Sequence, residues 1–185
     1  MPSPKGLKYY PNVLTEESEK ILVEWIDHQK WNESLSRRTQ HYGYEYNYRS
    51  RTAAKPTRAI EGPLYDLATS LQESEIMTPT QCIINEYTQN QNISAHIDAL
   101  IFGPVVVSVS LLAPTLMLFT NGTEKFEIVL EPRSMVILTE DARYKWKHEI
   151  VKRQNFKLPD GTIYTKPSNY RRISLTYRTL ANVST

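Results

Sequence analysis

Apolar residues recur at helical spacing in the first part of the chain. Thr15 precedes two glutamates, a pattern typical of a helix N-cap followed by an acidic first turn. The apolar positions that follow share one face of a helix: Ile21, Leu22, Trp25 and Ile26. This spacing predicts a helix over 15–29. A second helix is expected over 57–72, with a break or restart at Gly62-Pro63.

The segment between these helices, 31–55, is aromatic and basic. Four tyrosines in it occupy alternate positions: Tyr42, Tyr44, Tyr46 and Tyr48. Successive side chains of a strand point to opposite faces, so alternate positions share one face. We therefore expect all four rings on one side of a strand or hairpin.

The pattern changes at about residue 80 to short apolar or alternating runs separated by turn residues. The runs that predict strands are 81–88, 93–98, 105–112, 115–120, 124–130, 134–139, 143–151 and 171–179. Asn121-Gly122, between two such runs, is a strong hairpin signal. The stretch 154–170 is expected to be a loop.

About eight short strands with this punctuation favour a jelly roll. The expected fold class is α+β, mostly β: a double-stranded β-helix (jelly-roll) core with an N-terminal helical and α/β part packed on it. A chain of 185 residues is most simply one domain. We divide 1–185 into an N-terminal part, 1–79, and a jelly-roll core, 80–180.

Composition is that of an ordinary globular protein, since 40% of the residues are apolar and 23% are charged. No apolar run approaches the roughly 20 residues that span a bilayer, and the N-terminus lacks a signal-peptide pattern. The single cysteine, Cys82, excludes an internal disulfide framework and a multi-cysteine zinc site. We expect a monomer without membrane contact, located inside the cell in the cytoplasm or nucleus.

Net charge is only +2, but the basic residues are unevenly distributed. Two segments hold half of them: Arg37, Arg38, Arg49, Arg51, Lys55 and Arg58 within 31–60, and Arg143, Lys145, Lys147, Lys152 and Arg153 within 142–153. Two basic segments that meet in the fold would form a surface that attracts phosphates. The alternative is two ordinary solvated faces, and charge alone does not separate the two interpretations.

Candidate chemistry begins with His96 and Asp98. They lie two apart in a predicted strand and therefore point to one face, roughly 6–7 Å apart at Cα, which suits two ligands of one metal ion. His148, in a predicted strand further along, would supply the third ligand. Two neutral imidazoles and one carboxylate, with the remaining positions open, form the ligand set of a non-haem Fe(II) oxygenase. Taken singly, each residue is more often structural or on the surface.

A polar and cationic row follows in the last predicted strand. One face would carry Arg172, Ser174, Thr176 and Arg178. Buried cations need an anionic partner, and arginines at both ends of such a row could grip a short diacid such as 2-oxoglutarate. Asn85 and Tyr87, on an earlier strand, could hydrogen-bond the same diacid or satisfy each other in the core. The other interpretation has the row facing solvent.

Together these residues resemble a known family. The succession Asn85-x-Tyr87, His96-x-Asp98, His148 and Arg172-x5-Arg178 is similar to that of the AlkB family of Fe(II)/2-oxoglutarate dioxygenases. The similarity covers about 35–180. Within the family it is strongest to the AlkB domain of the tRNA wobble-uridine hydroxylases, through the segments 37–46 and 132–148.

The resemblance implies roles at the matching positions. The metal ligands and catalytic residues would be His96, Asp98 and His148. The 2-oxoglutarate site would consist of Arg172 at the distal carboxylate, assisted by Asn85 and Tyr87, with Arg178 near the metal-bound end. The substrate-binding residues would be Arg38, Tyr42, Tyr44 and Tyr46 in a lid over the pocket, with Arg143 and Tyr144 at its mouth.

The implied activity is oxidation, with Fe(II), 2-oxoglutarate and O2, of a modified or alkylated base in nucleic acid, with RNA or tRNA favoured over DNA. An N-methyl carbon would be lost as formaldehyde, whereas a stable carbon would keep the hydroxyl. DNA-repair members tend to carry acidic residues soon after the H-x-D motif, and here Ala99, Leu100, Ile101 and Phe102 follow. Two alternatives stay open: a dioxygenase that acts on a protein side chain, and a non-catalytic nucleic-acid-binding module.

Overall fold

The computed structural model describes residues 3–47 and 52–181, and for 46–47 and 52–54 it describes the backbone alone. In chain order the elements are β1 (Leu7–Tyr10), α1 (Glu16–Asp27), β2 (Thr39–Tyr42), β3 (Tyr44–Asn47), β4 (Thr52–Pro56), α2 (Pro63–Glu73), β5 (Gln81–Thr88), β6 (Ile93–His96), β7 (Phe102–Leu111), β8 (Thr115–Asn121), β9 (Glu124–Leu130), β10 (Ser134–Leu138), α3 (Glu140–Tyr144), β11 (Lys147–Ile150), β12 (Asn155–Lys157), β13 (Ile163–Thr165) and β14 (Arg171–Leu180).

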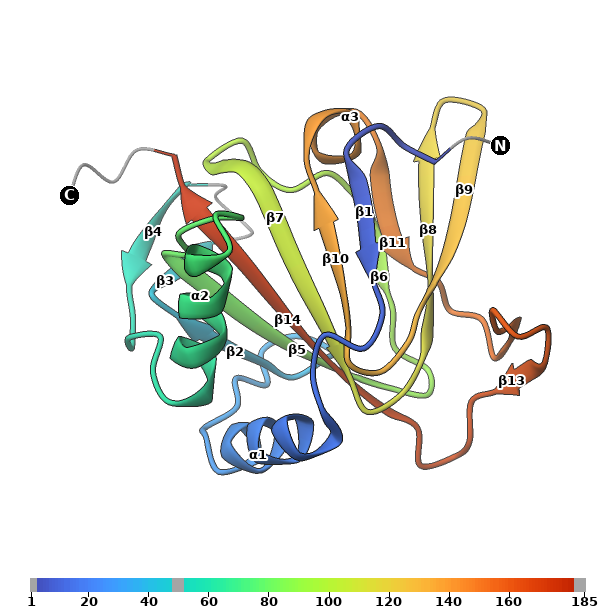
Figure 1. Cartoon of the computed structure of the whole chain (residues 1–185), viewed down its shortest axis with the longest axis horizontal. Coiled ribbons are helices and arrows are strands. Elements are labelled where there is room, and N and C mark those ends of the chain that lie inside the picture. Colours follow the sequence, from blue (N-terminus) through green and yellow to red (C-terminus); the bar gives the residue numbers. More distant parts are fainter. Residues whose placement is uncertain (1–2, 48–51, 182–185) are drawn as a thin grey trace.

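Two antiparallel sheets form the centre of the fold (Figure 1). The larger sheet has the order β1-β10-β7-β14-β5-β2, and the smaller sheet has the order β6-β11-β8-β9. The last strand, β14, lies between β7 and β5 and pairs with both, so the end of the chain occupies the middle of the larger sheet. Strands that cross between two facing sheets in this way make a jelly roll, and the predicted fold class is confirmed.

Both long helices cover one face of the larger sheet (Figure 1). Alternation along β14 decides which side chains meet them, because successive residues point to opposite faces. The contacting apolar residues include Leu22 and Ile26 of α1, Leu64 and Leu71 of α2, and Ile173, Leu175 and Tyr177 of β14. Each fully buried side chain of this size stabilises the fold by about 1.5–3 kcal/mol.

The opposite face of the larger sheet looks toward the smaller sheet. The apolar residues packed there include Val106, Val136 and Leu138 from the larger sheet and Met117, Phe119 and Ile150 from the smaller one. The polar residues of β14 share this interior face with them. Alternate residues of β14 therefore have different roles: those on one face pack against the helices, and those on the other face are available for the chemistry of the site.

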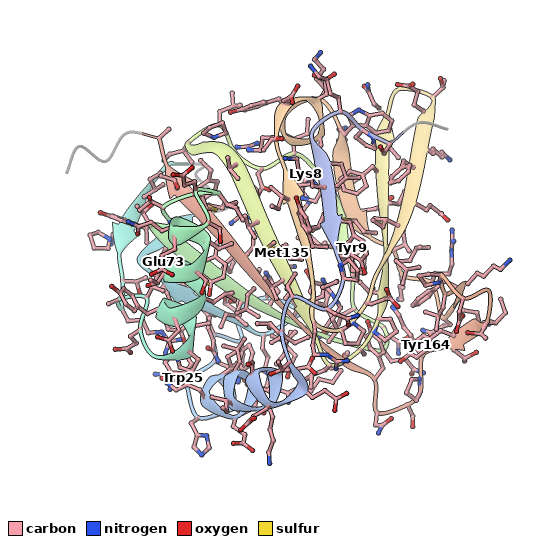
Figure 2. All side chains as sticks on the ribbon, in the orientation of Figure 1. Lys8, Tyr9, Trp25, Glu73, Met135 and Tyr164 are labelled. Carbon is pink, nitrogen blue, oxygen red and sulfur yellow. The ribbon has the colours of Figure 1, made fainter. Side chains whose placement is uncertain are left out.

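The predicted helices form, with one changed start. Thr15 caps α1 as expected, since its hydroxyl accepts a hydrogen bond from the Ser18 amide at 3.0 Å. Helix α2 begins at Pro63 rather than at residue 57. Gly62 has a φ of +56°, which is incompatible with a right-handed helix, and proline is favoured in the first helical turn. Figure 2 labels Trp25, which projects from α1 and packs against Tyr42. Among the described residues no helix has the length and apolar character needed to cross a membrane.

The tyrosine-rich segment does not form a single strand, so the prediction that its rings share one face is wrong for Tyr42. Gly43 has a φ of +74° and separates β2 from β3, and a Cβ at this position would overlap the Thr80 carbonyl. Strand β2 joins the larger sheet beside β5, whereas β3 pairs with β4 in a separate two-stranded sheet. Tyr48 lies outside the described residues.

Three further elements differ from the predictions. Strand β1, which was not predicted, pairs with β10 at the edge of the larger sheet. The predicted strand 143–151 consists of the end of α3 followed by β11, since the chain turns at Lys145 before it extends. The predicted loop 154–170 contains the hairpin β12–β13, which projects from the body of the molecule; Figure 2 labels Tyr164 on it.

Cys82 lies on β5 with its side chain in the core between the larger sheet and the helices. Burial raises the pKa of its thiol to about 12. Its position is that of an inert core thiol.

A buried carboxylate joins α1 to the larger sheet. Glu86, on the helix-facing side of β5, is 5% exposed and accepts hydrogen bonds from Arg38 at 2.6 and 2.8 Å and from Arg171 at 2.6 Å. Arg171 also forms a salt bridge with Asp27 at the end of α1. Burial alone would raise the pKa of Glu86, but the two guanidinium groups outweigh it and hold this pKa below its ordinary value.

Replacing Glu86 by glutamine is expected to lower the free energy of unfolding by about 1.5–3 kcal/mol at pH 7, because hydrogen bonds to charged groups contribute about that much. The deficit should shrink as pH falls through the lowered pKa of Glu86, since protonation removes the same interaction from the parent protein. Urea unfolding at neutral and acid pH measures both effects. Glu127→Gln, which removes an exposed partner of Arg153, is the matched control and should cost less than about 1 kcal/mol. Equal losses in the two variants would contradict the prediction.

Candidate active site

Two histidines face each other across a strand pair. Strand β6 pairs with β11 in a register that sets His96 directly opposite His148, and their ring centroids are 4.4 Å apart. Asp98 follows β6 by two residues, in the loop that leads to β7. Its Oδ2 atom lies 3.8 Å from Nε2 of His148. The fold therefore gathers all three predicted ligand residues at one end of the interior.

The Asp98 carboxylate is held from the larger sheet. It is 6% exposed, and its Oδ1 atom accepts a hydrogen bond from Nη2 of Arg178 at 2.5 Å. Burial would raise the pKa of Asp98, but Arg178 and the two histidines lower it to about 2. The carboxylate is thus ionised at neutral pH, with one oxygen fixed by Arg178 and the other turned toward His148.

The histidines are suited to act as neutral ligands. Nδ1 of His96 lies 2.8 Å from the Ser94 carbonyl, which can only accept, so in the neutral ring Nδ1 carries the hydrogen and Nε2 keeps the free electron pair. Burial lowers the pKa of His148 to about 4, although Asp98 opposes this shift. His148 is therefore uncharged at pH 7, the state in which imidazole binds a metal ion.

The three side chains are of the right chemical types to bind a metal ion, but the distances between them are slightly longer than those between ligands of one ion. As the side chains are placed, no three His, Cys, Asp or Glu residues within 3–47 and 52–181 stand close enough to hold one ion. Ligand atoms with metal bonds of about 2.0–2.2 Å lie roughly 3 Å from one another. His148 and Asp98 would have to approach a little from 3.8 Å, which small rotations of their side chains allow. One carboxylate and two imidazoles with open positions fit Fe(II) better than a closed structural zinc site.

Arg172 provides a site for an anion deeper in the interior. Its side chain comes from β14 and is 1% exposed. Nη2 donates to the Ser110 hydroxyl at 2.7 Å, and the guanidinium lies 5.2 Å from the Tyr87 ring. Nε and Nη1 are buried with no hydrogen-bond partner among the described residues. Because unpartnered buried donors on a cation are costly, this position fits a carboxylate that accepts two hydrogen bonds.

A cavity of about 930 Å³ connects the two positions. Hydroxyl groups cover its floor between Arg172 and Arg178: Ser108 contacts Ser174 at 3.0 Å and Thr176 at 3.4 Å. Asn85 also lines the cavity, and its Oδ1 atom accepts a hydrogen bond from Nε of Arg37 at 2.9 Å. A polar floor and an apolar wall from the smaller sheet form a chamber of the size that ligand sites usually have.

Three of the predicted substrate-binding residues do not face this cavity. Arg38 points to the opposite side of the sheet, where it binds Glu86 and lies 4.6 Å from the Trp31 ring. Tyr42 is fully buried against α1, and its hydroxyl donates to Gln40 at 2.7 Å. The predicted substrate roles of Arg38 and Tyr42 are therefore corrected to structural roles. The residue that lines the cavity in this segment is Arg37, one position earlier.

Arg143 is the third correction, because it is 1% exposed and does not reach the mouth. Its guanidinium donates to the carbonyls of four residues in and beside the β6–β7 loop: Asp98 at 2.9 Å, Ala99 at 2.9 Å, Phe102 at 3.0 Å and Gly103 at 3.2 Å. No local pattern predicts this role, since a basic residue in a basic segment is expected to be exposed. Arg143 fixes the backbone that carries Asp98.

The other predicted substrate residues have varied positions. Tyr144 is 43% exposed and lines the cavity mouth. Tyr44 packs with Ala99, Ile101 and Phe102 beside that mouth. The side chain of Tyr46 lies outside the described part of the structure. Substrate roles for these three stay predictions.

Most of the described basic residues of the two basic segments have partners within the fold. Arg58 lies 4.1 Å from the Tyr42 ring, Lys145 pairs with Asp141 at 3.0 Å, and Arg153 pairs with Glu127 at 3.1 Å. Arg49 and Arg51 are outside the described residues. These contacts favour the interpretation of ordinary surface and structural charges over one continuous phosphate-binding surface.

Comparison with known proteins identifies the family. Residues 6–178 match the 2OG-Fe(II) oxygenase superfamily, in which 2OG is 2-oxoglutarate. The chain belongs to this superfamily. Fe(II), 2-oxoglutarate and O2 are thus its cofactor and co-substrates, and it is a dioxygenase.

The relatives make it an oxygenase of the AlkB type. The chain is 33% identical over 167 residues to the tRNA (carboxymethyluridine(34)-5-O)-methyltransferase ALKBH8 of Macaca fascicularis, and the aligned region covers 82% of this chain and 25% of that protein. It is 30% identical over 206 residues to the alkylated DNA repair protein ALKBH8 homolog of Arabidopsis thaliana, and this alignment covers 96% of this chain and 59% of that protein. The solved structure of OsALKBH1 superposes with a TM-score of 0.70 at 16% identity, over 97% of this chain and 98% of that one, and shows the same fold. The chain spans between a quarter and three-fifths of the length of the two sequence relatives.

Replacing Arg172 by glutamine is expected to weaken 2-oxoglutarate binding roughly 100-fold, because a buried anion without its cation costs about 2–5 kcal/mol. Calorimetric titration of the anaerobic Fe(II)-loaded protein measures the dissociation constant, and the same titration with Fe(II) tests the metal site separately. Arg153→Gln, a surface arginine with an exposed carboxylate partner, should bind 2-oxoglutarate like the parent protein. An unchanged affinity in Arg172→Gln would contradict the assignment.

Proposed function

We propose that this chain oxidises a modified base in nucleic acid, RNA in preference to DNA, at the end of the cavity where His96, Asp98 and His148 converge. The single observation that carries the proposal is the combination of these three side chains with a buried Arg172, two of whose donors have no partner among the described residues, along the same cavity. One group of residues suits a metal ion, and the other suits the far carboxylate of a diacid.

The residues divide the work by charge. His96, Asp98 and His148 would hold Fe(II), which together with 2-oxoglutarate and O2 supplies hydroxylation of a C–H bond. Arg178 keeps one oxygen of Asp98 occupied, so the other oxygen is the one that the carboxylate would offer to a metal ion. Arg172 would take the distal carboxylate of 2-oxoglutarate, with Tyr87 against its guanidinium and Asn85 nearby.

Charge also favours a class of base. Among the described residues that line the cavity, Asp98 is the only carboxylate, and Arg178 already neutralises it. The cations that line the same cavity are Arg37, Arg172 and Arg178. A cationic alkylated base would lose its hydration there without gaining an anionic partner. The site is therefore better suited to an uncharged or anionic base.

Support for nucleic acid comes from the mouth and the relatives, and the preference for RNA rests on the relative that is named for tRNA. An exposed aromatic ring, Tyr144, and the cationic Arg37 both line the cavity, and such groups stack on bases and contact phosphates. The macaque relative is named for tRNA, and the Arabidopsis relative is named for alkylated DNA.

The proposal is tested by incubating the protein with Fe(II), 2-oxoglutarate, O2 and RNA or DNA oligonucleotides that each carry one modified base. Nucleoside mass spectrometry is expected to find an oxidised or demethylated base in RNA, with succinate formed in proportion. Asp98→Asn, which removes the anionic ligand, is the control and should abolish product. Oxidation of a peptide panel with no change in any base would replace the proposal by a protein-directed function, and no succinate in any reaction would favour a binding module.

The charge preference is tested with isomeric bases. The rate on N6-methyladenine, which is neutral, should exceed the rate on N1-methyladenine, which is cationic at pH 7, by about tenfold or more, the factor that roughly 1.4 kcal/mol of unpaired charge produces. Ala99→Glu, which adds a carboxylate at the mouth, should move the ratio toward the cationic isomer. A parent enzyme that prefers N1-methyladenine would contradict this part of the proposal.

A further inference from the structure

Leu100 lies at the cavity mouth in an unusual position for a large apolar side chain. It is 78% exposed, more than any other large hydrophobic residue that the structure describes, and it lines the cavity. Single exposed leucines are common and need no explanation by themselves. Leu100 differs because of the backbone that carries it.

The turn that carries Leu100 is held in place by a buried side chain. The residues on both sides of it, Ala99 and Phe102, give their carbonyl oxygens to the buried guanidinium of Arg143, and Asp98 and Gly103 do the same. Four hydrogen bonds from one rigid, planar donor leave this loop little freedom. An exposed loop tip ordinarily lacks such an anchor.

The same guanidinium also fixes an aromatic ring beside the loop. It lies 4.8 Å from the Tyr144 ring, which is half-exposed at the cavity mouth. One buried cation thus sets the positions of an apolar tip and an aromatic face next to the opening. Both groups are therefore preorganised in the absence of substrate.

We infer that Leu100 is a wedge that enters a nucleic-acid stack and occupies the space left when the target base turns out into the cavity. The inference rests on the proposed function. A base inside a helix cannot reach a buried metal site, so it must leave its stack. Leucine is among the side chains that proteins insert between base steps, and a side chain on a fixed loop enters without losing conformational freedom. Tyr144 would face the displaced base.

Ile163 supplies a matched control. It is 67% exposed, similar to Leu100, but it lies on β13. Figure 1 shows β13 at the lower right, away from α3 and the start of β7 at the top, whose residues Tyr144 and Phe102 line the cavity. Loss of a general surface contact would affect Leu100→Ala and Ile163→Ala alike, whereas loss of a wedge would affect Leu100→Ala alone.

The test uses an RNA hairpin with 2-aminopurine in its stem, whose fluorescence rises when this base leaves the stack. The protein is loaded with Fe(II) and 2-oxoglutarate without O2. The parent protein and Ile163→Ala are expected to raise the fluorescence at saturating protein, and Leu100→Ala is expected to lose most of that rise. Leu100→Met, which retains a long apolar side chain, should restore it. Thermal unfolding of each variant establishes that it is folded.

Turnover gives a second measurement, with whichever base the parent enzyme oxidises. The ratio of kcat/KM on a base-paired stem to kcat/KM on the single strand of the same sequence should fall about tenfold in Leu100→Ala. Ile163→Ala should keep the parent ratio. A parent-like ratio and a parent-like fluorescence rise in Leu100→Ala would overturn the wedge while leaving the proposed function intact. A parent protein that neither unstacks nor oxidises any base would overturn both.

Discussion

The salt bridge between Arg178 and Asp98 holds the two halves of the site together. Arg178 comes from the larger sheet, and Asp98 comes from the end of a strand of the smaller sheet. Both side chains are more than nine-tenths buried, so neither charge could remain there without the other. The bond also orients the carboxylate, which sets one oxygen toward His148. One contact thus orients Asp98 and is the largest of the interactions that lower its pKa.

Arg143 acts on the same loop through neutral partners. Where Arg178 binds the side chain of Asp98, Arg143 binds its backbone and that of the residues beyond it. Burial lowers the pKa of Arg143, and nearby Asp98 opposes that shift. Carbonyl dipoles cannot neutralise a charge, but they can solvate it in place of water. Two arginines therefore hold the loop from two sides. Arg143 is enclosed by the backbone that it binds, whereas Arg178 also lines the cavity.

Local periodicity carried much of the prediction. Strand 81–88 forms at its predicted limits, the alternation along 171–179 places Arg172 and Arg178 on the interior face, and the spacing of His96, Asp98 and His148 brings them together. The failures arise where long-range contacts choose the face. Arg37 and Arg38 are equivalent in sequence, and only pairing of β2 with β5 directs one to the cavity and the other to Glu86. Likewise, the reversal at Gly43 puts Tyr42 in the core, and nothing local to Arg143 reveals the loop carbonyls that it meets.

The position of Cys82 has a consequence for an enzyme that handles oxygen next to a metal. Its sulfur lies on the helix-facing side of β5, whereas Asn85 and Tyr87 of the same strand face the cavity. A pKa of about 12 keeps the thiol protonated, and oxidants attack the thiolate far more readily. The sheet thus shields the sole sulfhydryl group of the chain from oxidation by species formed in the cavity during turnover, without help from a reductant.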